Sequence, residues 1–286
     1  MTGRWLKRAN LLDETYLQGT IVPDPEYLIA RLKVWEERPD LLEFPLKVNT
    51  ADPHYDYHTE WDDFAVMPIT TYEHWLKSTI KKDVKENLRR AVREGVIARV
   101  VAYDDNFVQG IKNLCDETPI RQGKRFWHHG KSFEAIKEVH GSFRDRAEFI
   151  GAYLDGELIG FLKMVYVDTY AKTVHVISKE KFHQKRPTNA LIAKAVEVCA
   201  EKQLSHFIYG EYNFPGKRNT SLTEFKCRHG FQECKYPRYF VPLTLRGKVA
   251  LQLGLHRGLH RRVPVSINQL YLRLRAMYYR LRVQKD

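Results

Sequence analysis

Residues 173–212, TVHVISKEKFHQKRPTNALIAKAVEVCAEKQLSHFIYGEY, decide the fold of this chain. Side chains alternate in character over 173–178, which predicts a strand. A nearly all-round apolar stretch follows over 190–200, where only two positions are polar, and it predicts a helix that is covered on most sides. A second strand pattern ends the stretch at Tyr212. A strand, a covered helix and another strand in about 40 residues indicate a crossover unit in a sheet with parallel pairing.

The two ends of this unit give more detail. Alternation places Thr173, His175 and Ile177 on one face of the first strand. Pro187 suits the first helical turn, because an amide there would have no partner within the helix, and Thr188 is the expected cap.

Composition indicates a globular protein with one unusual segment. The chain has 286 residues, of which 43% are hydrophobic, and its formal net charge is +12. Residues 246–286 hold ten Lys or Arg and one acidic residue, whereas residues 1–245 carry a net charge of only +3. The body is therefore almost neutral, and the basic character lies in the tail.

Cysteine spacing and hydropathy predict a reduced, cytoplasmic protein. The four cysteines show no paired spacing, and Cys199 lies within the apolar helix. The first residues lack the apolar core of a signal peptide, and no run approaches the roughly 20 apolar residues that span a bilayer. We therefore expect a chain that is neither secreted nor transmembrane.

Residues 1–60 contain one clear helix. Its pattern runs from Pro25 to Glu37, and the Pro- and Asp-rich stretch 41–63 is interpreted as an irregular connection. Alternating metal-ligand side chains occur in that connection, at Asp52, His54, Asp56 and His58. Imidazole and carboxylate suit divalent metals. A polar loop without a metal is the favoured interpretation, so no metal site is predicted.

A short strand and a long basic helix precede the central region. FAVMPIT, 64–70, predicts the strand, and Thr70 with Glu73 predicts a capping box that starts a helix over 71–94. One side of this helix is basic, at positions Lys82, Lys85, Arg89 and Arg93. It is either a solvated face or an anion-binding face.

The element order predicted over 96–244 is strand, two helices, a three-stranded meander, helix, strand, helix and strand. Asp155-Gly156 is a strong hairpin signal, because a type I′ turn needs positive φ at both central residues. Ser221 and Glu224 predict a second capping box. The irregular loop 119–132 combines basic and aromatic side chains, and Arg121, Trp127 and His128 are its candidate substrate-binding residues.

This order resembles the GNAT acyltransferase fold, and four strings are similar to its FemAB-like branch. They are KENLRRAVREGV (85–96), PTNALIAKAVE (187–197), YGEY (209–212) and SLTEFKCRHGF (221–231). The resemblance implies an α/β (α+β) domain with a mixed, mostly antiparallel sheet flanked by helices. It also implies acyl transfer, since the best-known FemAB-type members move amino acids from aminoacyl-tRNA to peptidoglycan precursors. Lys226 follows Phe225 as in that branch, where the lysine is implied to neutralise a donor phosphate or the developing oxyanion.

The turn before the central helix departs from the pattern of GNAT enzymes that use acetyl-CoA. In those enzymes a glycine-containing Q/R-x-x-G-x-G/A turn binds the pyrophosphate through backbone amides. Here the corresponding residues lack both glycines, although Lys185 and Arg186 offer side-chain charge. The candidate cofactor-binding residues are Gln184, Lys185, Arg186, Thr188 and Asn189.

Acyl transfer to an amine needs a base, an oxyanion donor and an acid for the leaving group. Strand alternation puts Tyr209 and Glu211 on one face near the strand's end, so Tyr209 is a candidate acid and Glu211 a candidate base. Lys226 and His175 complete the candidate catalytic set. For each of them a plain structural role is the alternative, and for His175 a role as a core residue is favoured.

The tail, 247–286, predicts a basic amphipathic helix. Its apolar stripe consists of Ile267, Leu270, Tyr271, Leu274, Met277 and Tyr278. Such a helix is typical of a membrane-surface element over anionic lipid. Phosphate contact with tRNA and docking on the protein itself are the alternatives.

The sequence thus predicts three parts: an N-terminal extension over 1–95, a GNAT-like domain over 96–245 and the tail over 246–286. The predicted function is N-acyl transfer to an amino group of a cell-envelope or polysaccharide precursor at the inner membrane face. The donor is an acyl-CoA, slightly favoured, or an aminoacyl-tRNA. The alternative is a catalytically silent module that binds membrane or nucleic acid through its tail.

Overall fold

The computed structural model describes residues 5–10, 24–45, 55–121, 124–213 and 220–257. The chain divides into two compact units. Unit 1 comprises 1–65, 211–218 and 233–264, and unit 2 comprises the other residues. The predicted boundaries at 95 and 245 stay a prediction.

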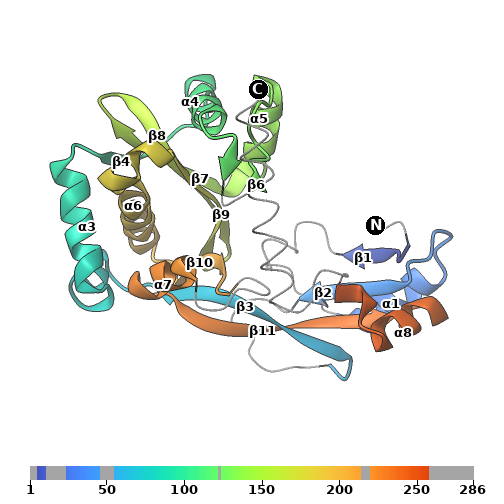
Figure 1. Ribbon diagram of the computed structural model, residues 1–286. Helices are drawn as coiled ribbons and strands as arrows, with labels where there is room; N and C mark the ends of the chain where they lie inside the picture. Colours follow the sequence, from blue (N-terminus) through green and yellow to red (C-terminus); the bar gives the residue numbers. More distant parts are fainter. Residues whose placement is uncertain (1–4, 11–23, 46–54, 122–123, 214–219, 258–286) are drawn as a thin grey trace. The chain divides into compact units, whose positions relative to one another are not determined.

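Unit 1 is built around the strand order β1-β2-β11-β3 (Figure 1). Its core consists of side chains from α1, β2 and β11, among them Ile29, Phe44 and Tyr239. Its elements are β1 Arg8–Asn10, α1 Pro25–Lys33, β2 Leu41–Pro45, β3 His58–Pro68, β11 Gln232–Pro242, α8 Leu245–Gln252 and the short 3-10 helix η4 Leu255–Arg257.

Strands β2 and β3 correct the interpretation of 41–63 as an irregular connection. Residues 41–45 form β2, which pairs antiparallel with β11. Strand β3 begins at His58, six residues before the predicted strand. Arg238 of β11 donates to Glu43 and to Asp62, so the partners of this stretch lie almost 200 residues away in the chain. Local patterns do not report such pairing.

Unit 2 contains the strand order β10-β9-β8-β7-β4, in which only β9 and β10 are parallel (Figure 1). The predicted GNAT-like order of strands and helices over 96–244 is confirmed. The elements of unit 2 are α2 Tyr72–His74, η1 Trp75–Thr79, α3 Lys82–Arg93, β4 Ile97–Val101, α4 Asp105–Asp116, β5 Ile120–Arg121, β6 Lys124–Arg125, α5 Phe133–His140, η2 Arg144–Arg146, β7 Ala147–Leu154, β8 Glu157–Val167, β9 Tyr170–Ser178, η3 Glu180–Lys185, α6 Pro187–Glu201, β10 His206–Glu211 and α7 Ser221–Arg228.

Helices cover both faces of the sheet in unit 2 (Figure 1). On one face, α4 and α5 bury a cluster that includes Phe107, Ile111 and Ile136 against Phe149 and Phe161. On the other face lies α6, nine of whose residues are buried, as its apolar sequence predicts. The hairpin turn is also as predicted, with φ of 49° at Asp155 and 84° at Gly156.

The long helix predicted over 71–94 is interrupted. A π-helical turn, η1, ends at Thr79, Ile80 is extended, and α3 begins at Lys82. The interruption is tertiary in origin, since the Lys81 amide donates to the carbonyl of Arg228 across 3.0 Å. Without a glycine or proline at this place, the sequence carries no local signal of the break.

Three predicted caps are also corrected. Thr71, not Thr70, accepts the amide of His74. Thr220, not Ser221, caps α7 by accepting the amide of Thr223. Arg186 is the N-cap of α6, so the Thr188 hydroxyl is not its cap.

Gly230 occupies a position where a larger residue would meet both an unfavourable backbone conformation and a steric clash. Its φ is +95°, and an added Cβ would lie 2.3 Å from Cγ2 of Thr79. Gly156 has a similar φ of +84° but open space around it. We expect Gly156→Ala to cost roughly 1 kcal/mol in free energy of unfolding for the backbone alone. Gly230→Ala should cost roughly 1–3 kcal/mol more, for overpacking. Urea unfolding of both variants measures the difference, and equal losses would contradict the packing described here.

Candidate functional site

The parallel pair β9–β10 is open at one end. Its ladder joins only Tyr170, Ala171 and Lys172 to residues 206–208. Beyond the ladder, β9 continues to Ser178 and β10 to Glu211. The sequence-predicted residues Tyr209 and Glu211 therefore lie on the part of β10 that follows the ladder.

Three cationic or phenolic side chains converge at this end. Nζ of Lys226 lies 5.3 Å from the ring centroid of Tyr209. Lys226 is a charged residue with only 1% of its surface exposed. Nη1 of Arg121 donates to the carbonyl of Ser178, the last residue of β9, across 3.2 Å. Arg121 also interacts electrostatically with Tyr209. The structure thus brings together three residues that lie far apart in the sequence.

Burial decides the protonation of this group. It raises the pKa of Tyr209 to about 12, against the opposing charge of Arg121. Burial also lowers the pKa of Arg121. At neutral pH the phenol of Tyr209 therefore keeps its proton and can donate a hydrogen bond, while Arg121 stays cationic.

A hydrogen-bond chain fixes α7 to the start of α6. Asn189 Nδ2 lies 3.1 Å from Nε2 of His229, and Nδ1 of His229 lies 2.7 Å from the carbonyl of Phe225. The two contacts assign the proton to Nδ1, with Asn189 donating to Nε2. Burial lowers the pKa of His229 to about 4, so the ring is neutral. The side chain of Asn189, a predicted cofactor ligand, thus holds α7 in place.

The turn 184–189 does not fit the amide cradle of coenzyme A pyrophosphate. The amide of Arg186 donates to His183, and the amide of Asn189 donates to Arg186. Pro187 has no amide hydrogen. Arg186 itself has φ +59°, and its Nε is buried without a hydrogen-bond partner among the described residues.

The other side chains of the turn have their own positions. Lys185 forms an ion pair with Glu94, with 3.0 Å between Nζ and Oε2. The Thr188 hydroxyl lies 3.0 Å from that of Ser178. Gln184 is exposed. Arg186 is therefore the cation of this turn that has a buried guanidinium nitrogen without an acceptor among the described residues.

Glu211 lies at the exposed end of β10. It follows Gly210, whose φ of +83° bends the chain in a conformation that favours glycine. Its role as a base stays a prediction.

In the loop before α5, the two neighbouring predicted substrate-binding residues Trp127 and His128 differ in exposure. Trp127 is 64% exposed, and Nζ of Lys131 lies 3.2 Å from its ring centroid. His128 is buried instead. Its ring lies 5.7 Å from that of His175, measured between centroids.

His128 and His175 belong to a histidine cluster, buried at His128 and half-buried at His175, that the sequence did not predict. The ring of His140, from the end of α5, lies 4.6 Å from that of His128 and 4.5 Å from that of His175. Burial lowers the pKa values of His128 and His175 to about 4 and that of His140 to about 2. A base with so low a pKa accepts protons poorly at neutral pH, so we do not include His175 in the proposed reaction centre.

A β-bulge separates His175 from Thr173. Lys163 pairs with His175, but Met164 pairs with Thr173, so Val174 is the extra residue. Thr173 and His175 therefore lie on opposite faces, which corrects the predicted alternation.

Lys163, a lysine within an apolar strand sequence, is fully buried and donates to the carbonyls of His140 and Ser142. Burial lowers its pKa to about 8. A single lysine inside an apolar strand pattern is thus the one feature of the sequence that could have indicated buried polar groups near His128, His140 and His175.

Comparison with known proteins identifies the fold. No family model and no curated protein matches the sequence. Among solved structures, FemX is similar with a TM-score of 0.59 and 11% identity, over 83% of this chain and 82% of that one. A conserved protein of unknown function from Bacteroides thetaiotaomicron is similar with a TM-score of 0.52 and 10% identity, over 77% of this chain and 76% of that one.

The chain shares the fold of FemX, which confirms the GNAT-like, FemAB-like fold that the sequence predicted. The site that the resemblance implies, at the end of β10 and in the turn 184–189, stays a prediction. At 10–11% identity, however, the likeness to the two structures concerns the fold alone.

Proposed function

We propose that this chain is an acyltransferase that moves an acyl or aminoacyl group to an amino group of a cell-envelope or polysaccharide precursor. The observation that carries the proposal is the convergence of Arg121, Tyr209 and Lys226 at the open end of β9–β10. The FemAB-like fold supports the reaction class by analogy. The site of action, by the same analogy, is the cytoplasmic face of the membrane.

The three side chains match the charges that develop during acyl transfer. Attack of an amine on the acyl carbon creates an oxyanion, and collapse of that intermediate needs a proton for the leaving oxygen or sulfur. Tyr209 keeps its proton at neutral pH and is the donor. Lys226 and Arg121 place positive charge beside it, where a partly water-excluded environment strengthens electrostatic stabilisation. Glu211, at the strand end, is the proposed base for the attacking amine.

The donor is held by side-chain cations rather than by an amide cradle. The turn 184–189 has no glycine, its Arg186 and Asn189 amides are bonded within the turn, and Lys185 is paired with Glu94. Arg186 is the candidate phosphate ligand, and Trp127 offers an exposed aromatic surface. Phosphates of an acyl-CoA and of an aminoacyl-tRNA meet this requirement alike, so the proposal covers both donors and the experiment has an arm for each.

Donor binding is tested by thermal unfolding of the full chain with acetyl-CoA, a long-chain acyl-CoA, aminoacyl-tRNA or uncharged tRNA. A ligand at 100 times its Kd stabilises the native state by about 2.7 kcal/mol. For a chain of this size we expect one donor class to raise Tm by roughly 5–10 °C. The matched variant Arg186→Gln should lose most of this shift, while Arg31→Gln, in unit 1, should keep it. Absence of a shift with every donor would refute the proposal.

A catalytically silent module is the second candidate function. Its predicted binding element, the stripe of the tail at 267–278, lies outside the described residues. In the described part of the chain, no helix is long and apolar enough to cross a membrane. Replacing Glu211 and Lys226 with alanine distinguishes the two functions, because transfer to an identified acceptor that survives both changes would exclude the assigned reaction centre.

A further inference from the structure

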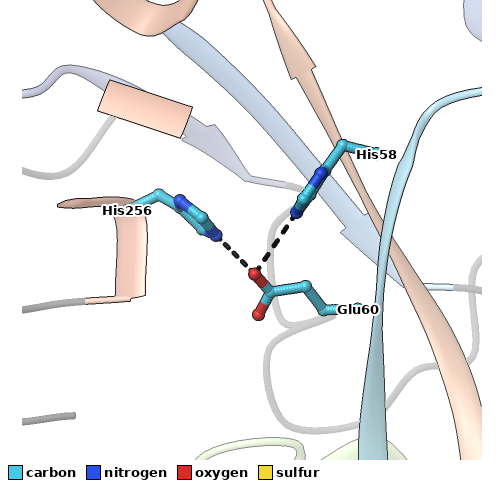
Figure 2. A group of neighbouring side chains, drawn as sticks. All are labelled: His58, Glu60 and His256. Atoms are coloured by element: carbon cyan, nitrogen blue, oxygen red, sulfur yellow. Dashed lines mark hydrogen bonds and ion pairs between the residues drawn. The ribbon is translucent and has the colours of Figure 1, made fainter. Parts of the chain in front are cut away.

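Three potential metal ligands that the proposed acyl transfer does not use meet in unit 1. His58 and Glu60 lie two positions apart on β3, and side chains with this spacing share one face of a strand. His256 comes from η4, 196 residues after Glu60. Figure 2 shows the two imidazole rings directed toward the same carboxylate oxygen of Glu60.

The three side chains differ in how far they are exposed to solvent. His256 has a fully buried side chain, Glu60 is 16% exposed and His58 is 41% exposed. The ring of His256 packs on Phe240, with 4.8 Å between the centroids. One side of the group is thus fixed by packing, and the other side is open to an entering ion.

The distances are close to those of a metal site. Ligand atoms about 2.0–2.2 Å from a tetrahedral Zn²⁺ lie about 3.2–3.6 Å from one another. Nε2 of His58 is already 3.5 Å from Oε1 of Glu60. Nε2 of His256 is 2.5 Å from the same oxygen, and all three ligand atoms lie within 4.8 Å of one another. Opening the shortest contact by about 1 Å would accommodate the ion.

The close approach of His256 to Glu60 marks a place that a metal ion can take. An imidazole nitrogen and a carboxylate oxygen at 2.5 Å share a proton, which the Nε2–H tautomer of His256 supplies, and a metal ion replaces that proton when both atoms become ligands. Nδ1 of His256 is buried and has no hydrogen-bond partner among the described residues, so the protein does not balance this ring through its other nitrogen.

Arg257 is the internal competitor for this place. Its Nε donates to Oε1 of Glu60 across 2.8 Å, and its side chain is 51% exposed. Both imidazoles face this same oxygen, so an ion bound there requires Arg257 to move to Oε2 of Glu60 or to turn into solvent. Its charge nevertheless weakens the attraction for any second cation.

We propose that His58, Glu60 and His256 form a site for one divalent transition-metal ion of the Zn²⁺ class. Two imidazoles and one carboxylate are a ligand set that Zn²⁺ takes with a further position left open. Because the ligands come from β3 and η4, the ion pins the end of the described chain to the sheet of unit 1. The inference does not depend on the proposed acyl transfer.

The test is titration of the chelator-treated full chain with Zn²⁺, and with Co²⁺ as a spectroscopic probe. We expect one ion per chain, a rise in Tm, and visible Co²⁺ absorption of the tetrahedral type. His58→Ala and Glu60→Gln should each weaken Zn²⁺ binding by at least about tenfold, the lower end of what loss of even an outer-shell partner costs. His74→Ala, which removes an exposed histidine elsewhere, is the matched control.

Arg257→Gln gives a prediction of opposite sign, since loss of the competing charge should tighten Zn²⁺ binding. His58 is partly exposed and Gln keeps the shape of Glu60, so these variants are expected to fold, and their Tm without metal checks this. Equal Zn²⁺ affinity of wild type, His58→Ala and Glu60→Gln would overturn the proposal. A wild type that does not bind one Zn²⁺ per chain would also overturn it. The three side chains would then form only a hydrogen-bonded group without a metal.

Discussion

Replacing Lys226 with methionine is expected to lower kcat/KM for acyl transfer by about 10²- to 10³-fold, the usual loss on removal of one oxyanion-stabilising group. Methionine fills the buried space of the lysine stem beside Tyr209 but carries no charge. Lys194→Met, at a lysine of α6 whose side chain is 25% exposed, is the control and should leave kcat/KM unchanged. Steady-state transfer from the stabilising donor measures both.

Tyr209→Phe isolates the proton that the phenol holds. Phenylalanine retains the packing against Phe225 and Phe231, whose ring centroids lie 6.1 and 5.6 Å away. Loss of a positioned acid costs about 10²- to 10⁴-fold in rate. If Tyr209 and Lys226 act together, the double variant should lose far less than the product of the single losses. Full activity of Tyr209→Phe would remove the tyrosine from the reaction centre.

Acid should unfold unit 2 steeply because of its histidine cluster. His128, His140 and His175 have native pKa values of about 4, 2 and 4, below the ordinary value of 6.5. Between about pH 6.5 and 4, these three histidines therefore bind protons in the unfolded chain but stay neutral in the native chain. Stability is complete above this window and falls as the pH drops through it. The charges of Lys163, Lys131 and Arg121 around the cluster act in the same direction.

The size of the acid effect follows from the number of protons. Each histidine contributes a slope of up to about 1.4 kcal/mol per pH unit, so three give roughly 4 kcal/mol per unit, a large share of a typical total stability of about 5–15 kcal/mol. Urea unfolding at a series of pH values measures this slope. His140→Phe, which replaces the ring packed on Phe161, should lower the slope by about one proton, while His74→Ala should not change it. An identical pH profile for His140→Phe and wild type would contradict the assignment.

Local signals predicted the centre of the fold and missed the parts made by distant pairing. The hairpin at Asp155-Gly156 and the apolar helix α6 follow from turn chemistry and hydrophobic pattern, and both are confirmed. Strand β2 forms because β11 pairs with it, and the break after Thr79 forms because the carbonyl of Arg228 takes the Lys81 amide. Such contacts leave no trace in a window of neighbouring residues.

The candidate site shows the same division. Tyr209, Lys226 and Arg121 were each selectable by residue type and resemblance, but their convergence depends on the loop before α5 meeting the end of β9. The role of Asn189 became visible only through His229, which closes the chain between α6 and α7. His58, for its part, was noticed beside Asp52, His54 and Asp56, whereas the structure gives it Glu60 and His256 as companions.

Amide hydrogen exchange of the full chain, with and without the donor that raises Tm, tests the central claim most directly, because it locates the bound donor on the chain. The account predicts new protection in residues 173–178 at the end of β9, in Tyr209 and Gly210, and in the turn 184–189. Protection confined to unit 1, or donor binding that leaves the open end of β9–β10 unchanged, would contradict it.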